Sequence, residues 1–83
     1  MTATRQDLAL WFDEGLHRRA THMIVVCDQY DWTDYPVYVA PDEDVLKRAA
    51  EYQGHPMQKI MEVYDLRQDR DEQINADRRV FNY

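Results

Sequence analysis

The 83-residue sequence is poor in cysteine, glycine and proline, with one, two and three of these residues respectively. Because Cys27 has no second cysteine to pair with, an internal disulfide is excluded, and with it a secreted disulfide scaffold. The scarcity of Gly and Pro and an apolar fraction of 45% argue against disorder. No apolar run approaches the roughly 18 residues of a membrane helix, and no signal-peptide pattern begins the chain. We therefore expect one soluble, intracellular domain over residues 1–83 that does not contact a membrane.

Basic residues are also absent from one long stretch, residues 28–46, although the whole chain has ten Lys and Arg. The stretch contains six of the sixteen acidic residues, so the other ten balance the ten bases and the net charge of −6 comes from this stretch. Its carboxylates are Asp28, Asp31, Asp34, Asp42, Glu43 and Asp44. Nucleic-acid binding relies on Lys and Arg contacts with phosphates, so we expect no direct nucleic-acid binding. A basic protein surface is the electrostatic complement.

Three elements are predicted in the first half of the chain. Helical spacing of apolar side chains predicts a helix over residues 4–20, with Thr4 as its N-cap. A β-branched run that is apolar on both alternating faces predicts a central strand over residues 22–28. Pro36 lacks an amide hydrogen, which places the second strand, residues 35–40, at the edge of the sheet.

The second half of the chain predicts two helices around a third strand. Acids in the first turn favour a helix over residues 42–53, and a cap-like start favours another from residue 69 to about residue 81. Residues 57–66 fit a helical stripe as well as a strand, but their β-formers favour a strand. The resulting order α-β-β-α-β-α predicts an α+β domain. Its three-stranded antiparallel sheet has the order 2-1-3 and packs with short helices, either with at least one on each side or with one face of the sheet against a partner.

Strict alternation in the third strand sorts its side chains into two faces. As a strand, residues 57–66 place Ile60 and Tyr64 on one face of the sheet. Met61 and Val63 then lie on the other face.

The residues that could carry chemistry do not form a known motif. The three aspartates at 28, 31 and 34 lack the alternate oxygen ligands, the Gly and the distal Glu of a calcium loop. His22 is disfavoured as a base for Cys27, because strand residues five apart point to opposite faces. The glycine pattern of a phosphate loop is missing too. We therefore predict no catalytic residue, no metal and no cofactor. The alternative is a small enzyme or enzyme accessory that holds a divalent ion in the Asp-rich hairpin loop.

What remains is an acidic and aromatic loop between the first two strands. Exposed Trp and Tyr side chains are typical of protein-binding hot spots, so we predict a partner-binding surface, with an inert solvated loop as the alternative. The predicted surface combines the loop, its base and the start of the next helix: Asp28, Tyr30, Asp31, Trp32, Asp34, Asp42, Glu43 and Asp44.

Two segments resemble a group of small proteins from phages and prophage regions. Residues 20–39 read ATHMIVVCDQYDWTDYPVYV, close to the group's ATHMIVVCD-x-[FY]-D-x-x-DYPVYV core, and residues 57–66 read MQKIMEVYDL, close to its M-x-x-[IV]-MEVYDL segment. The resemblance implies a phage-associated protein of the bacterial cytoplasm with no assigned enzymatic activity. Small acidic phage proteins often inhibit host defence, anti-CRISPR proteins among them. By analogy with that class, the acidic surface favours a non-enzymatic inhibitor that binds a basic, nucleic-acid-binding host complex and blocks its engagement of DNA.

Overall fold

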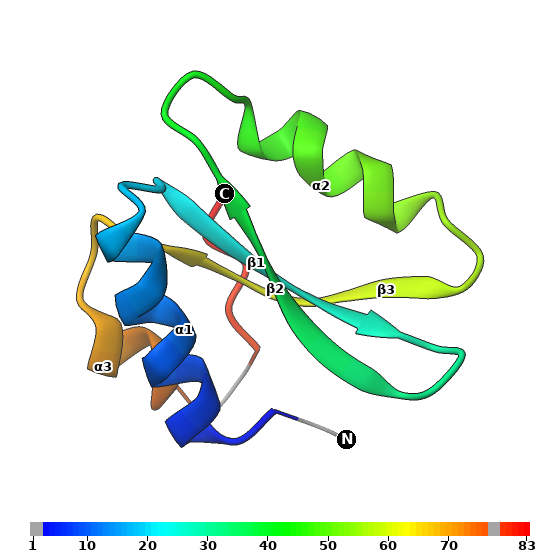
Figure 1. Cartoon of the computed structure of the whole chain (residues 1–83), viewed down its shortest axis with the longest axis horizontal. Coiled ribbons are helices and arrows are strands. Elements are labelled where there is room, and N and C mark those ends of the chain that lie inside the picture. Colours follow the sequence, from blue (N-terminus) through cyan, green and yellow to red (C-terminus); the bar gives the residue numbers. More distant parts are fainter. Residues whose placement is uncertain (1–2, 77–78) are drawn as a thin grey trace.

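The structure is a computed structural model that describes residues 3–76 and 79–83. Its elements follow the predicted order and are shown in Figure 1. They are α1 (Arg5–His17), β1 (His22–Asp28), β2 (Thr33–Val39), α2 (Val45–Gln53), β3 (Gln58–Asp65) and α3 (Arg70–Ile74). Residues 57–66, for which the sequence fits both a helix and a strand, therefore contain a strand.

The three strands form an antiparallel sheet in the order β2-β1-β3, which confirms the predicted α+β fold and strand order. β1 pairs with β2 from His22 opposite Val39 to Asp28 opposite Thr33. On its other side it pairs with β3, and its four central residues are fully buried. A strand that is apolar on both faces is stable only with cover on both faces.

The helices supply that cover from opposite sides (Figure 1). α1 and α3 pack on one face of the sheet, and α2 packs on the other. The first core cluster contains Leu8, Phe12, Met23, Val25, Tyr64, Leu66 and Ile74. The second contains Ile24, Val26, Val37, Val39, Ala49, Ile60 and Val63. Alternate residues of β1 thus enter different clusters, as the period of a strand requires.

A β-bulge in β3 makes the predicted sorting of its side chains wrong. Val25 pairs with Glu62 whereas Val26 pairs with Ile60, so Met61 is an extra residue between two paired ones. An extra residue reverses the alternation that follows it. Ile60 and Val63 therefore share the α2 face, and Met61 packs on the α1 face.

The end of α1 also differs from the prediction, because the helix ends at His17 and not at residue 20. The Arg19 amide donates to the Leu16 carbonyl and the Ala20 amide to the Gly15 carbonyl, at 3.0 and 2.9 Å. This pair of bonds is a Schellman motif, whose residue in the left-handed region is usually Gly. Here it is Arg19, with φ 61°.

The last predicted helix is too long. α3 ends at Ile74, and Phe81, which was expected to close the helix, instead forms a parallel bridge with Val63 of β3. The Val63 amide donates to the Val80 carbonyl at 2.7 Å, so the end of the chain lies along the β3 edge. Residues 77–78 of the predicted helix lie outside the described residues. Helix-capping signals depend on neighbouring residues only, so they could not predict the pairing of Phe81 with Val63.

The starts of two other elements shift by a few residues. β2 begins at Thr33 and not at residue 35, which shortens the hairpin loop. α2 begins at Val45 and not at residue 42, because Asp44 is its N-cap and has an extended backbone.

Candidate functional site

The predicted surface begins with the four-residue loop between β1 and β2. The Trp32 amide donates to the Asp28 carbonyl at 2.7 Å, a single helix-like turn that closes the loop. Trp32 completes the turn with φ 59°, in the left-handed region that bulky residues rarely adopt. We call Tyr30, Asp31 and Trp32 the hairpin tip.

The aromatic side chains of the hairpin tip are exposed. Tyr30 is 85% exposed and Trp32 is 64% exposed. Most of the large apolar side chains in a folded domain are at least partly buried, so two neighbouring exposed rings at one protruding turn are unusual.

The carboxylates around the loop hold the backbone. Asp28 accepts a hydrogen bond from the Tyr30 amide at 2.9 Å, and Asp31 accepts one from the Thr33 amide at 3.1 Å. Both are Asx turns, in which an Asp side chain replaces a backbone acceptor two residues away. Asp28 and Asp31 therefore have a local structural role in shaping the turn.

Asp34 does not belong to the exposed tip, contrary to the expectation. Its side chain is turned inward, and the residue is only 9% exposed. One oxygen accepts the Ala3 amide at 2.9 Å, which ties the start of the described chain to β2. Asp34 also lies opposite Cys27 in the sheet.

The acids before α2 have structural roles as well. Glu43 accepts the Ala40 amide at 2.9 Å and pairs with Arg48 at 2.8 Å. The bond from the Ala40 amide, together with that from Arg48, lowers the pKa of the Glu43 carboxyl below its usual value. Asp44 accepts the Leu46 amide and so caps the helix. Asp42 is exposed.

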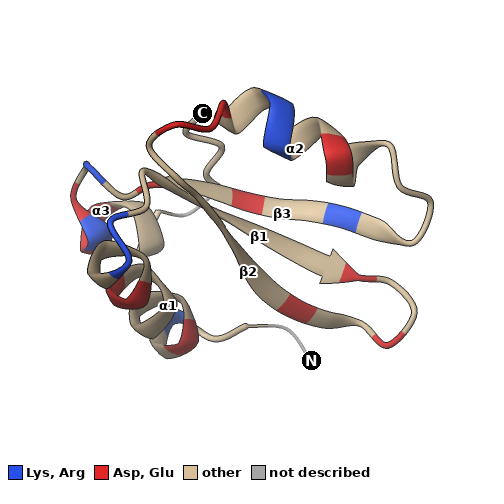
Figure 2. Cartoon of the chain, turned by 45° about the horizontal axis from the view of Figure 1, so that its top comes forward, with Lys and Arg blue, Asp and Glu red and all other residues tan. Residues whose placement is uncertain are grey.

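The structure separates the eight predicted residues into two groups. Figure 2 shows acidic residues in the loop that ends the hairpin and, apart from them, in the segment before α2. The first group lies at the Thr33 end of β2 and the second follows its Val39 end. A seven-residue strand spans about 20 Å, so one small contact cannot cover both groups.

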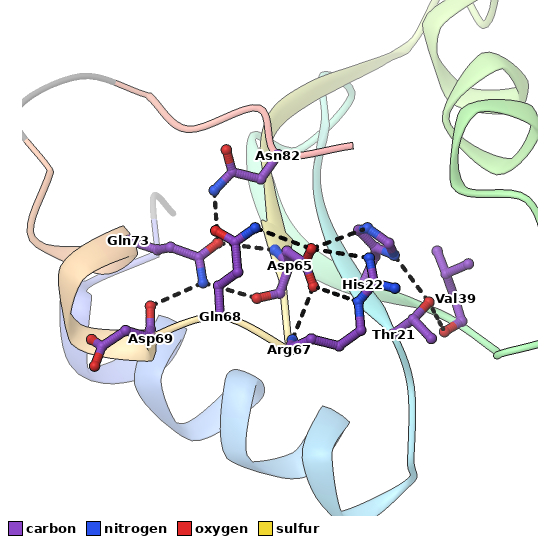
Figure 3. Close-up of polar contacts among 9 residues, drawn as sticks. All are labelled: Thr21, His22, Val39, Asp65, Arg67, Gln68, Asp69, Gln73 and Asn82. Atoms are coloured by element: carbon purple, nitrogen blue, oxygen red, sulfur yellow. Dashed lines mark hydrogen bonds and ion pairs between the residues drawn. The ribbon is translucent and has the colours of Figure 1, made fainter.

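A buried polar network at the opposite end of the sheet was not predicted (Figure 3). The Gln73 amide oxygen accepts from the Asp65 backbone amide and from the Asn82 side chain, both at 2.9 Å. Its nitrogen donates to the Asp65 and Asp69 carbonyls at 2.9 and 3.0 Å. One buried side chain thus joins β3, the start of α3 and the C-terminal segment.

Asp65 is the charged centre of this network (Figure 3). Its carboxylate accepts from the Arg67 backbone and guanidinium at 2.9–3.1 Å and from Gln68 at 3.3 Å. The hydrogen bonds from Arg67 lower the pKa of the Asp65 carboxyl. His22 Nδ1 lies 2.9 Å from the Thr21 hydroxyl, and Nε2 lies 3.9 Å from Asp65 and has no hydrogen-bond partner among the described residues.

Burial decides the protonation of His22 and Cys27, which were weighed above as a catalytic base and nucleophile. Desolvation lowers the pKa of His22 against the opposing attraction of Asp65, so the neutral ring is favoured. Desolvation raises the pKa of the Cys27 thiol, and hydrogen bonding to Asp34 raises it further. A thiol at neutral pH is a poor nucleophile.

One sequence signal could have located the network. In the predicted antiparallel order, the first residue of β1 faces the last residue of β3, and His22 does pair with Asp65. The role of Gln73 depends on the short α3 and the C-terminal segment, whose paths were mispredicted.

The described part of the chain offers no cluster for a metal. Within residues 3–76 and 79–83, no three His, Cys, Asp or Glu side chains converge in a way that could hold an ion. None of the helices in these residues is long and apolar enough to cross a membrane.

Comparisons of the chain with protein-family models, with curated proteins and with solved structures give no match.

Proposed function

We propose that this chain is a non-enzymatic binding protein whose hairpin tip docks on a basic protein surface. The observation that carries the proposal is the conformation of Trp32, a large apolar side chain that is exposed at a positive φ. The left-handed region costs an ordinary residue roughly 1–2 kcal/mol relative to Gly. Such strain is typical of functional sites, where a side chain is held for a contact and not for stability.

The charge around the tip supports a basic partner. Asp28 and Asp31 each use one oxygen for a backbone amide, which leaves the negative charge at the surface beside the rings. Trp and Tyr supply the apolar contact that dominates binding energy, and the carboxylates steer the approach of a cationic surface. Asp42, Glu43 and Asp44 lie too far away for the same contact and add to the long-range field.

The narrower form of the proposal concerns what the basic surface does. Basic protein surfaces commonly hold nucleic acid, because Lys and Arg displace its counterions. A protein docked there would exclude DNA by steric overlap and by charge, which is how an anti-CRISPR-type inhibitor of a phage would act on a host defence complex. The sequence resemblance to phage proteins supports this form.

The test compares the chain with two variants as baits in bacterial lysate, followed by kinetics on the captured protein. Trp32→Ala is expected to speed dissociation and to weaken binding by about 2 kcal/mol, as hot-spot truncations do. Asp31→Asn keeps the Asx turn, because an Asn oxygen also accepts the amide, but it removes the charge. It is expected to slow association and to flatten the salt dependence.

Leu46→Ala is the matched control, since Leu46 is 60% exposed on α2. A captured protein that binds the Trp32→Ala variant as tightly as the original chain would reject the hairpin tip as the contact. Binding that is indifferent to salt would reject the basic partner. Failure of the complex to exclude DNA from the captured protein would reject the narrower form alone.

A further inference from the structure

A second loop lies beside the hairpin tip at the same end of the sheet. The Gln29 amide of the hairpin donates to the Met57 carbonyl at 2.8 Å. Asp28 pairs with Gln58 directly after it, so the two loops are joined at the last rung of the β1–β3 ladder. In Figure 1, the loop between α2 and β3 and the hairpin both extend from this end of the sheet.

The second loop is held by its own hydrogen bonds. The Met57 amide donates to His55 Nδ1 at 3.2 Å, and the Gln58 amide donates to the His55 carbonyl at 3.3 Å. A loop fixed in this way presents its side chains with little ordering cost on binding.

The side chain that this loop presents is apolar. Met57 is 41% exposed and thus adds a third large apolar side chain to Tyr30 and Trp32 at one end of the molecule. Methionine is flexible and polarisable, contacts aromatic rings favourably, and is common at adaptable binding surfaces.

We infer that the docking surface continues from the hairpin tip onto the α2–β3 loop, with Met57 as its third apolar contact. The inference rests on the proposed function. The partner it fits is a protein surface that combines an apolar recess with surrounding cationic groups. Three apolar side chains fill the recess, while Asp28 and Asp31 face its rim.

The charge of the combined surface supports this choice of partner. Within residues 28–33 and 54–59 the two carboxylates Asp28 and Asp31 outnumber the single basic residue, Lys59. Lys59 lies on β3 opposite Cys27 of β1 and is exposed.

The test uses two synthetic peptides of equal charge, one alternating Arg with Leu and one alternating Arg with Ser, titrated into the full chain. Methyl-labelled methionine and indole NH signals are followed by NMR. Met23 is fully buried and Trp11 is half-buried, so their signals are internal controls. We expect the Met57 methyl and the Trp32 indole to shift with one common midpoint, and only with the Arg–Leu peptide.

Variants separate the contact from general charge. Met57→Gln is expected to weaken the Arg–Leu peptide about fivefold, a difference typical of an apolar contact at an interface. Leu46→Gln, an equally apolar loss elsewhere on the surface, is expected to leave the midpoint unchanged. Both positions are exposed, so both variants should fold.

The outcomes distinguish the two proposals. A shift of Trp32 without Met57 overturns the extended surface and leaves the hairpin tip as the contact. Equal binding of both peptides overturns the extended surface together with the apolar contact of the tip. If neither signal shifts with the Arg–Leu peptide at millimolar concentration, the extended surface and the proposed function both fail.

Discussion

At its first residue, His22, β1 enters a buried polar network, whereas at its last residue, Asp28, it leads into a loop whose polar groups are largely exposed. At the His22 end, side chains from distant segments satisfy one another, with Gln73 as the centre. At the Asp28 end, the carboxylates of Asp28 and Asp31 each bond to an amide two residues away, whereas Asp34 bonds to a distant one, that of Ala3.

The polar groups at the His22 end stabilise the fold, whereas those at the Asp28 end shape a loop that exposes its side chains. Long-range hydrogen bonds among buried groups hold elements together. When one of these bonds is lost, the remaining donor or acceptor is buried and has no water or other group to bond to. Local bonds at an exposed turn fix the shape of the turn alone, and water can replace them. We therefore expect stability to depend on the His22 end and binding to depend on the Asp28 end.

The strongest test of this contrast is the same substitution at both ends. Gln73→Met keeps the volume of the side chain but leaves the Asp65 amide and the Asn82 side-chain amide without their acceptor. The Asp65 and Asp69 carbonyls each lose one donor and keep a backbone amide, from Gln68 and from residue 73 respectively. Since each buried unsatisfied group costs about 1–3 kcal/mol, we expect a loss of about 2 kcal/mol or more in the free energy of unfolding, measured with urea. Gln29→Met at the loop retains its backbone bond and should change stability by less than about 0.5 kcal/mol. Equal losses at both sites would contradict the contrast.

The dependence of stability on pH should come from the His22 end. The folded pKa of His22 is below its ordinary 6.5, so below that pH the unfolded chain takes up a proton that the folded chain does not. The free energy of unfolding should therefore fall as the pH drops below about 6.5, by at most about 1.4 kcal/mol per pH unit for this group. Asp65, whose folded pKa is also lowered, adds a further loss below its ordinary 3.8.

Denaturation at a series of pH values measures this effect. His22→Gln should remove the decline between about pH 6.5 and pH 5. An unchanged slope in the His22 variant would assign the decline to other groups.

The smallest expected effect concerns the two residues with positive φ, Trp32 at the tip and Arg19 after α1. At each position the Gly variant should be more stable than the Ala variant by about 0.5 kcal/mol. Ala keeps the backbone strain and Gly relieves it, but the greater entropy of Gly in the unfolded chain offsets part of that gain. Paired urea denaturation curves would resolve the difference. A partner should distinguish the sites, since replacing Arg19 leaves binding intact while both Trp32 variants lose it. If Ala is the more stable at Trp32, the backbone there is not strained.

The sequence was sufficient for the sheet and insufficient for its irregularities. The two-sided apolar run of β1 and Pro36 in β2 determine which strand is central and which is at an edge, and the strand order followed. The bulge at Met61, the early end of α1 and the bridge from Phe81 to β3 each depend on contacts between distant segments. Local periodicity and capping signals do not contain such contacts.

The candidate site was predicted in part for the same reason. Exposure of Tyr30 and Trp32 follows from their place in a short hairpin loop, and the sequence indicated it. The inward turn of Asp34 depends on the distant Ala3 amide, and the neighbourhood of Met57 depends on strand register. The sequence predicted the residues whose position depends on the local turn, and it did not predict those whose position depends on pairing with distant segments.

The bulge at Met61 has a consequence for how relatives of this chain are aligned. Bulges are kept within families, but one residue can be lost if the strand straightens. A relative without the bulge would carry the same inward residues as Ile60 and Val63 with one position fewer between them. An ungapped comparison would then pair residues of the α1 face with residues of the α2 face in the rest of β3. A one-residue gap at Met61 would place the residues of each face opposite one another again.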